Sequence, residues 1–262
     1  MELQLDAHLI TDVGMGRERN EDRCGAFSPE DPQTRAERGR LYVVADGMGG
    51  YVGGDIAAEL IMDALPSAYF HGRWAGATDT LRSAFIATNA AIEQKATAEP
   101  ENQGMGAAAV AAVIFSDHLV LAHLGDCRAY MIRAGQGLRL TIDHSWVQER
   151  INAGWLTDDE ARVHAYRNVL TRALGAETDA DPTVSQVEFH PDDALILCSD
   201  GLWGVIDDDE IAQIAMQHAN AKDAARAMVD LALERGGADN ISVIVVRAVG
   251  MANEDGQIDG TL

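Results

Sequence analysis

Short apolar runs bounded by glycine and polar turn residues recur along both halves of the chain and predict β-strands. The clearest runs are Leu3 to Val13, Leu41 to Ala45, Ala107 to Phe115, His118 to Leu124, Arg128 to Arg133, Thr183 to Phe189, Ala194 to Cys198 and Ile241 to Val249, and a short run follows Asp22. Apolar residues at helical spacing predict helices that begin at Asp55 and that cover Asp79 to Ala98, Asp207 to His218 and Lys222 to Arg235. The helices come in consecutive pairs. This order favours an α+β fold with antiparallel sheets over a parallel βαβ fold.

Three segments interrupt this pattern. Residues 28–40 are polar, contain Pro29 and Pro32, and predict a hairpin loop. Residues 143–175 are polar and mixed helical with no strand pattern, which predicts a flap over the domain. The polar end, residues 251–262, predicts a disordered tail. No repeat or linker divides the remainder, so we expect one domain over residues 1–250.

The stretch Leu41 to Gly54 organises these elements. A buried strand leads into Asp46 and Gly47, a glycine-rich turn follows, and a helix opens at Asp55. A carboxylate at the end of a buried strand is well placed to hold a metal ion, and glycine lets a backbone carbonyl approach the same ion. Taken alone, the segment fits equally well a strand-to-helix turn in which the aspartate is only a cap.

Three further acidic residues repeat this arrangement. Asp126 and Asp200 each follow an apolar strand, and Asp239 comes directly before the last strand. Carboxylates gathered at one rim of a sheet form an oxygen-rich pocket that suits Mg²⁺ or Mn²⁺, and two such ions can share a water molecule and bind a phosphoryl oxygen. Arg17 is the candidate to bind phosphate, because guanidinium contacts phosphate oxygens in bidentate fashion.

Composition narrows the possible partners. The 262 residues include 20 Lys and Arg against 42 Asp and Glu, which gives a net charge of −22. This acidity argues against nucleic acid or an anionic membrane as a partner. The three cysteines form no CxxC motif, so neither a disulfide framework nor a zinc site is indicated. No signal peptide or membrane-spanning stretch is recognised, and we expect a cytoplasmic protein.

Five motifs, in order, resemble PP2C-type (PPM) serine/threonine phosphatases. They are Arg17-x-x-Asn20-Glu21-Asp22, Asp46-Gly47-Met48-Gly49-Gly50, Gly125-Asp126-x-Arg128, Ser199-Asp200-Gly201-Leu202-Trp203 and Asp239-Asn240. Each motif is weak by itself, but five in order over residues 5 to 249 are specific. The DGMGG form resembles the bacterial branch of the family.

The resemblance implies a β-sandwich flanked by helix pairs, with a binuclear Mn²⁺ or Mg²⁺ centre at one end. Asp46, Asp200 and Asp239 would be direct ligands, together with the carbonyl of Gly47, and Asp126 would help to hold a weaker third ion. Glu21 and Asp22 would act mainly through metal-bound water. Arg17, Asp22, Asp46, Asp200 and Asp239 form the implied catalytic set. A metal-activated water would attack phosphoserine or phosphothreonine directly, on a protein substrate phosphorylated by a bacterial Ser/Thr kinase, and we expect a monomer.

The sequence departs from the family pattern at several positions. Gly204 stands where many relatives have an acid, which leaves the third ion open. Met48 replaces a histidine proposed as the general acid in other members, and His164 in the flap is a possible substitute. Gly106 and the two alanines after it replace a GTT-like segment, a change that we expect to affect packing more than chemistry.

Two rival functions are considered. A catalytically silent regulator that binds phosphoproteins would be expected to lose the core acids, which are present here. Phosphatases that act on anti-sigma-factor antagonists generally lack the RxxNED segment. A His144–Ser145 catalytic pair has no nucleophile-elbow context, so we expect a turn there, and His123 in its apolar run is expected in the core or the site wall.

Overall fold

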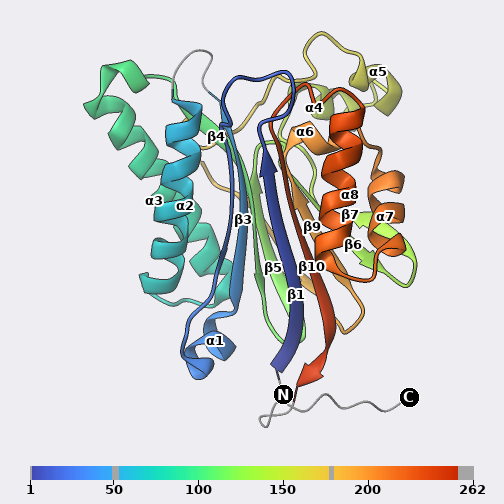
Figure 1. The fold of residues 1–262 in the computed structure, drawn as a ribbon. Coiled ribbons are helices and arrows are strands. Elements are labelled where there is room, and N and C mark those ends of the chain that lie inside the picture. Colours follow the sequence, from blue (N-terminus) through green and yellow to red (C-terminus); the bar gives the residue numbers. More distant parts are fainter. Residues whose placement is uncertain (1, 49–52, 177–179, 253–262) are drawn as a thin grey trace.

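Two five-stranded sheets, antiparallel throughout, stack face to face at the centre of the computed structural model (Figure 1). The structure describes residues 2–48, 53–176 and 180–252. The first sheet has, in spatial order, strands β1 (Glu2–Asp12), β10 (Ile241–Ala252), β9 (Ala194–Cys198), β6 (Arg128–Arg133) and β7 (Gln136–Arg139). The second has β2 (Asp22–Phe27), β3 (Arg40–Met48), β4 (Gly106–Ile114), β5 (His118–Leu124) and β8 (Thr183–Glu188).

Helices cover the outer face of each sheet, which confirms the predicted α+β sandwich flanked by helix pairs. Helices α2 (Gly54–His71) and α3 (Ala77–Ala98) pack on the second sheet. Helices α6 (Asp200–Trp203), α7 (Asp208–Gln217) and α8 (Ala221–Glu234) pack on the first. The remaining helices are α1 (Pro32–Arg38), η1 (Pro100–Asn102), α4 (Trp146–Asn152) and α5 (Asp158–Arg162). None of the described helices is long and apolar enough to cross a membrane.

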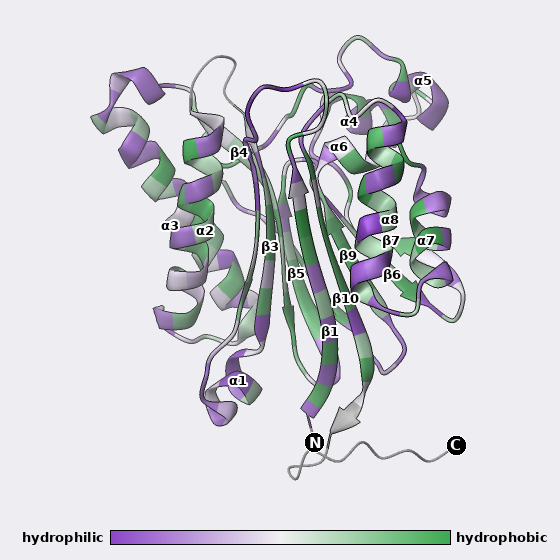
Figure 2. Cartoon of the chain, in the orientation of Figure 1, coloured by the Kyte–Doolittle hydropathy of each residue, from purple (hydrophilic) through white to green (hydrophobic). Residues whose placement is uncertain are grey.

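The side chains of β3 show why the strand sequences are continuous apolar runs. Leu41, Val43 and Ala45 join the core beneath α2 and α3. Tyr42 and Val44 point the other way, into the core between the two sheets. Successive side chains of a strand face opposite sides, so a sheet covered on both faces needs apolar residues at nearly every position. Figure 2 shows this concentration of hydrophobic residues along the strands.

The loops that carry the family motifs lie at one end of the sandwich. Figure 1 shows the β1–β2 loop and the segment before β10 reaching this end beside α4, α5 and α6. The segment predicted as a flap, residues 143–175, lies between β7 and β8 and contains α4 and α5, and one isolated bridge, between Ala107 and Leu174, links it to β4. The Gly106 segment allows this contact, because a side chain on Gly106 would meet the Leu174 carbonyl oxygen at 2.7 Å.

Several predicted boundaries are wrong for identifiable reasons. The expected loop at residues 28–40 contains α1, which Asp31 caps by accepting hydrogen bonds from Thr34. This helix buries no side chain, so it has no apolar periodicity to detect. After β6 the chain folds back in a hairpin and forms the exposed edge strand β7, which no apolar run predicted. Strand β3 runs two residues past Asp46, to Met48, and the following residues 49–52 and the tail at 253–262 lie outside the described part.

Candidate active site

Strand register brings the first carboxylates together. Asp22 begins β2 and lies directly opposite Asp46 of β3. Cys198 ends β9 and pairs with Val243 of β10, so Asp200, two residues later, and Asp239, just before β10, come to the same end of the sandwich. Residues far apart in sequence therefore share one rim because antiparallel strands begin and end there together.

A cavity of about 510 Å³ opens at this rim. Every predicted site residue except Asp22 lines it: Arg17, Glu21, Asp46, Gly47, Asp126, Asp200 and Asp239, together with Met48, Asn168, Leu170 and Asn240. Asp22 lies beneath the wall and is only 1% exposed. The structure thus gathers in one place residues that the sequence separates by more than two hundred positions.

The carboxylates of the cavity repel one another. Burial, followed by the charges of Asp200 and Asp22, raises the pKa of Asp46 well above its ordinary value. Burial and the charge of Asp239 raise the pKa of Asp200 to about 7, and burial raises that of Asp22 to about 6. Burial and the charge of Asp200 also raise the pKa of Asp126. A cluster of this kind binds positive charge favourably, because a cation relieves the repulsion.

Arg17 supplies one positive charge to the cluster. Its Nη2 donates to Oδ2 of Asp239 at 2.7 Å, and its side chain remains 53% exposed. The hydrogen bond and charge of Asp239, followed by the charge of Asp200, raise the pKa of Arg17 further. A half-exposed guanidinium at the cavity mouth has donors free to turn toward an incoming phosphate.

Buried hydroxyls fix the position of Asp22. Ser199 Oγ donates to Oδ2 of Asp22 at 2.7 Å and accepts from the Ser242 backbone N–H at 2.9 Å. Ser199 and Ser242 are both fully buried. Ser199 was not predicted to be a functional residue, although it directly precedes Asp200 in one of the motifs. Its effect becomes visible only when the start of β2 and the end of β9, which belong to different sheets, meet at one end of the sandwich.

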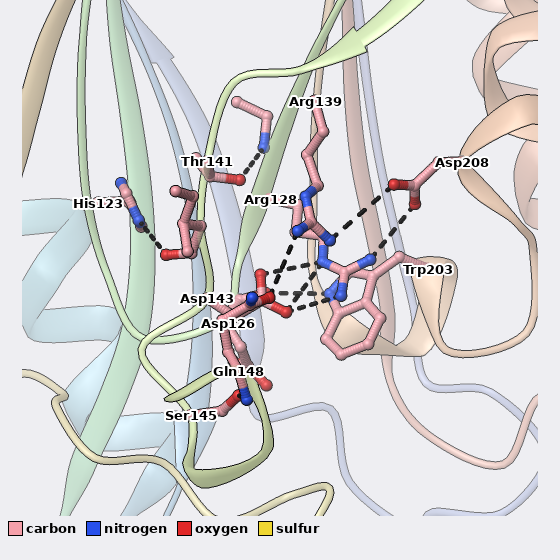
Figure 3. A network of polar contacts seen from close by, with 12 residues as sticks. His123, Asp126, Arg128, Arg139, Thr141, Asp143, Ser145, Gln148, Trp203 and Asp208 are labelled. Carbon is pink, nitrogen blue, oxygen red and sulfur yellow. Dashed lines mark hydrogen bonds and ion pairs between the residues drawn. The ribbon is translucent and has the colours of Figure 1, made fainter. Parts of the chain in front are cut away.

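A second polar network holds Asp126 and the base of the flap (Figure 3). Trp203 Nε1 donates to the carbonyl oxygen of Asp126 at 3.0 Å, and the Arg128 guanidinium lies 3.6 Å from the centre of the Trp203 ring. Arg128 binds both carboxylate oxygens of Asp143, with its shortest contact from Nη2 to Oδ2 at 2.6 Å. It also reaches Oδ1 of Asp208 at 3.3 Å. One stacked arginine therefore joins β6, the flap and α7 beside Asp126.

Two glycines let the backbone approach the site closely. A side chain on Gly47 would collide with the carbonyl group of Gly54, and one on Gly54 would lie 2.8 Å from Oε2 of Glu21. The start of α2 is thus pressed against β3 and against Glu21. The requirement for glycine at these two positions is steric, because an added side chain would meet backbone or side-chain atoms at less than 3 Å.

The donors around the cavity fit divalent metal ions by their chemistry. They are carboxylate and carbonyl oxygens, which hard ions prefer, and burial together with the charges of neighbouring carboxylates raises the pKa of Asp46 and of Asp200. Within residues 2–48, 53–176 and 180–252, no three His, Cys, Asp or Glu side chains already form a ligand cluster. Asp239 is paired with Arg17 in this arrangement.

The residues at which the sequence departs from the family pattern have distinct positions. Met48 lines the cavity, whereas His164 is absent from its lining and stacks on Trp146 with 4.9 Å between ring centres. Gly204 lies instead in an adjoining cavity of about 600 Å³ between the flap and α7, which shares Asn168 and Asp200 with the first.

The histidines and the serine outside the motifs have structural roles. His123 is 3% exposed, binds the Ile142 carbonyl oxygen and stacks on His144. His144 accepts from the Gly125 N–H and contacts Thr183, while Ser145 caps α4. The expected turn is wrong, because Ser145 has an extended backbone, forms a bridge with Leu170 and leads directly into α4. The contacts of His144 and Ser145 are with other residues, so they do not form a catalytic pair.

The fold and the cavity define an α+β sandwich protein with an acidic, oxygen-donor site. A family model described as "Protein phosphatase 2C" matches residues 12–241, and the chain belongs to this family. This assignment confirms the resemblance drawn from the five motifs.

Named relatives come from bacteria. The chain is 34% identical over 251 residues to the "Serine/threonine phosphatase stp" of Listeria innocua, covering 92% of this chain and 95% of the relative. It is 33% identical to the "Serine/threonine protein phosphatase PstP" of Mycobacterium tuberculosis, covering 91% of this chain and 44% of that longer protein.

Solved structures agree with the fold. Staphylococcus aureus Stp1 superposes with a TM-score of 0.87 at 31% identity, covering 95% of this chain and 98% of that one. The catalytic domain of PstP, solved in complex with two manganese ions, superposes with a TM-score of 0.81 at 30% identity, covering 95% of this chain and all of that one.

Proposed function

We propose that this protein is a metal-dependent phosphatase that hydrolyses phosphoserine and phosphothreonine in protein substrates. The observation that carries the proposal is the single cavity that combines buried, mutually repelling carboxylates with a half-exposed arginine. The names of the bacterial relatives support the reaction class.

In this proposal Asp46, Asp200, Asp239 and the carbonyl of Gly47 hold two divalent ions, Mn²⁺ or Mg²⁺. Asp126 takes part in a weaker third site. When bound, the ions neutralise the carboxylates, lower the pKa of a water molecule and polarise the phosphoryl oxygen.

The other proposed roles belong to the chain's own side chains. Arg17 turns from Asp239 toward the phosphate and binds its oxygens, which orients the phosphorus toward the attacking water. Glu21 and Asp22 accept hydrogen bonds from waters in the cavity, and Ser199 holds Asp22 in place. Attack is direct, with no phosphorylated side chain, and Met48 has no proton to give, so the leaving alkoxide takes its proton from solvent in the cavity.

The substrate class and setting are also proposals. We infer a protein phosphorylated by a bacterial Ser/Thr kinase, reached in the cytoplasm by a monomer whose catalytic domain spans residues 1–250. The net charge of −22 supports a protein rather than nucleic acid or an anionic membrane as partner.

The test is hydrolysis of p-nitrophenyl phosphate and of a phosphothreonine peptide in EDTA, Mg²⁺ and Mn²⁺. We expect turnover only with metal, and its loss in Asp200→Asn and Asp239→Asn. The matched control is Asp230→Asn, which changes an exposed carboxylate on α8 and leaves turnover unchanged. If folded wild-type protein shows no turnover with either metal, the enzyme is excluded and a silent phosphoprotein-binding regulator takes its place.

A further inference from the structure

The segment that carries Arg17 depends on contacts outside itself for its position. Residues 13–21 connect β1 to β2 and form neither helix nor strand. Arg17 and Glu21 both project from this loop into the cavity wall. A loop of nine residues without internal structure has many accessible conformations, so its placement must come from its anchors.

Asn240 is the side chain that anchors both ends of this loop. Its Oδ1 accepts from the backbone N–H of Glu21 at 2.8 Å. Its Nδ2 donates to the carbonyl oxygen of Val13 at 2.8 Å and to that of Arg19 at 2.9 Å. The residue is only 5% exposed, so these bonds form away from water, where an unpaired partner is costly.

A backbone contact between the loop and the segment before β10 reinforces the anchor. The amides of Met15 and Gly16 both donate to the carbonyl oxygen of Gly237, at 2.6 and 3.0 Å. A side chain on Gly14 would collide with the Asp239 carbonyl, and one on Gly16 with that of Ala238. The two segments therefore lie against each other along their length, with Asn240 at the end next to Glu21.

The chemistry of the amide matches this position closely. Three backbone groups require one acceptor and two donors, which a neutral carboxamide supplies. A carboxylate would accept from Glu21 but would face two carbonyl oxygens with no donor. An alanine would leave all three groups unpaired. Asn240 also follows Asp239 directly, so the same short segment fixes both Asp239 and the loop that carries Arg17.

We propose that Asn240 is a positioning residue that sets Arg17 and Glu21 at a fixed distance from Asp239. This inference rests on the proposed function only where it predicts an effect on KM and kcat. Asn240 touches no substrate in this scheme. It acts by holding the β1–β2 loop so that the guanidinium reaches the phosphate.

The kinetic test is a double-mutant cycle of Asn240→Ala and Arg17→Ala on metal-loaded protein with the phosphothreonine peptide. We expect Asn240→Ala alone to raise KM about tenfold with a smaller change in kcat, because the loss of anchoring costs phosphate binding. In the Arg17→Ala background the same substitution should change KM less than twofold. Equal effects in both backgrounds would show that Asn240 does not act through Arg17.

A second test does not depend on activity. Full-length protein without added metal is digested briefly with trypsin, and cleavage after Arg17 and Arg19 is followed by mass spectrometry. Asn240→Ala and the milder Asn240→Ser should speed cleavage at these two sites at least fivefold relative to cleavage after Arg226 on α8. Asn102→Ala is the matched control, since Asn102 is equally buried but lies in η1, and it should leave the ratio unchanged.

The outcomes separate the two proposals. Unchanged tryptic ratios in both Asn240 variants would overturn the anchoring role, even if the enzyme is active. Faster cleavage after Arg17 and Arg19 in the Asn240 variants, together with wild-type protein that hydrolyses no substrate, would retain the anchor and reject the phosphatase. If Asn240→Ala does not fold, the ratio of tryptic cleavage after Arg17 and Arg19 to cleavage after Arg226 is measured in Asn240→Ser, and an unchanged ratio there overturns the anchoring role.

Discussion

The ion pair between Arg128 and Asp143 offers the sharpest test of how the site is supported (Figure 3). Their side chains are 11% and 6% exposed, and three hydrogen bonds join them, two from Nε and one from Nη2. Burial by itself would lower the pKa of Arg128, but the charge and hydrogen bonds of Asp143 raise it above its ordinary value. The substitution Asp143→Asn keeps the size of the side chain and removes its charge.

We expect Asp143→Asn to lower the free energy of unfolding, because it leaves a buried guanidinium without its main partner. Breaking one side of a buried pair costs about 3–5 kcal/mol. Arg128 keeps Asp208, which is 39% exposed, and the Trp203 ring, so we expect a value near the lower limit, about 3 kcal/mol. For a chain of this length that corresponds to a fall in Tm of roughly 6–12 °C.

The assay is urea unfolding in EDTA, because bound metal would add its own stabilisation. Arg162→Gln is the control, since Arg162 also links the flap to α7, through Asp207, but both side chains are more than half exposed. The free energy of unfolding of that variant should fall by less than about 1 kcal/mol. Replacing both members, as Arg128→Met with Asp143→Leu, should recover most of the stability. A loss below about 1 kcal/mol for Asp143→Asn would refute the reasoning that burial makes this pair costly to break.

Three further predictions concern stability around the site. Burial, with the charges of His123 and Arg172, lowers the pKa of His144 to about 3, below the unfolded value of 6.5, so the unfolded state binds more protons between these values and stability falls as pH drops below 6.5. His144→Gln should weaken this fall in urea titrations from pH 7 to 4, and parallel curves would contradict the assignment. Ser199→Ala should cost about 1–3 kcal/mol in urea unfolding, since Asp22 and the Ser242 amide both lose a buried partner, and a change under 0.5 kcal/mol would argue against this role. Gly47→Ala should cost about 1–3 kcal/mol through overlap with Gly54, and a Tm equal to that of the wild type would show that the backbone adapts.

The sequence predicted the sandwich well because its strands are buried on both faces. For β5, β6 and β9 the predicted limits coincide with those observed, since each apolar run stops at a turn residue. Helix α1 and strand β7 were missed because neither buries a side chain that would give a periodic signal. Their hydrogen bonds, rather than hydrophobic burial, define them.

The candidate site was predictable as residues but not as contacts. Five short motifs placed Arg17, the acidic residues and Gly47 in one functional set. Ser199 and Asn240 stand in the motifs, but the contacts by which they hold this set in place were not visible there, because these contacts reach segments 177 and more than 200 positions away. The Arg128 network is likewise assembled from a strand, the flap and α7.

What the sequence determined and what only the tertiary structure decided differ for a physical reason. Alternation, helical spacing and turn residues are local properties, and they decided which segments become strands and helices and which residue types stand at strand ends. The distance between Arg17 and Asp239, 222 positions apart, depends on strand register and on loops packed against each other. Only the tertiary structure could place a guanidinium, five buried or partly buried carboxylates and the asparagine that anchors the β1–β2 loop around one cavity. The reason is that close packing and the pairing of buried polar groups act between segments distant in sequence.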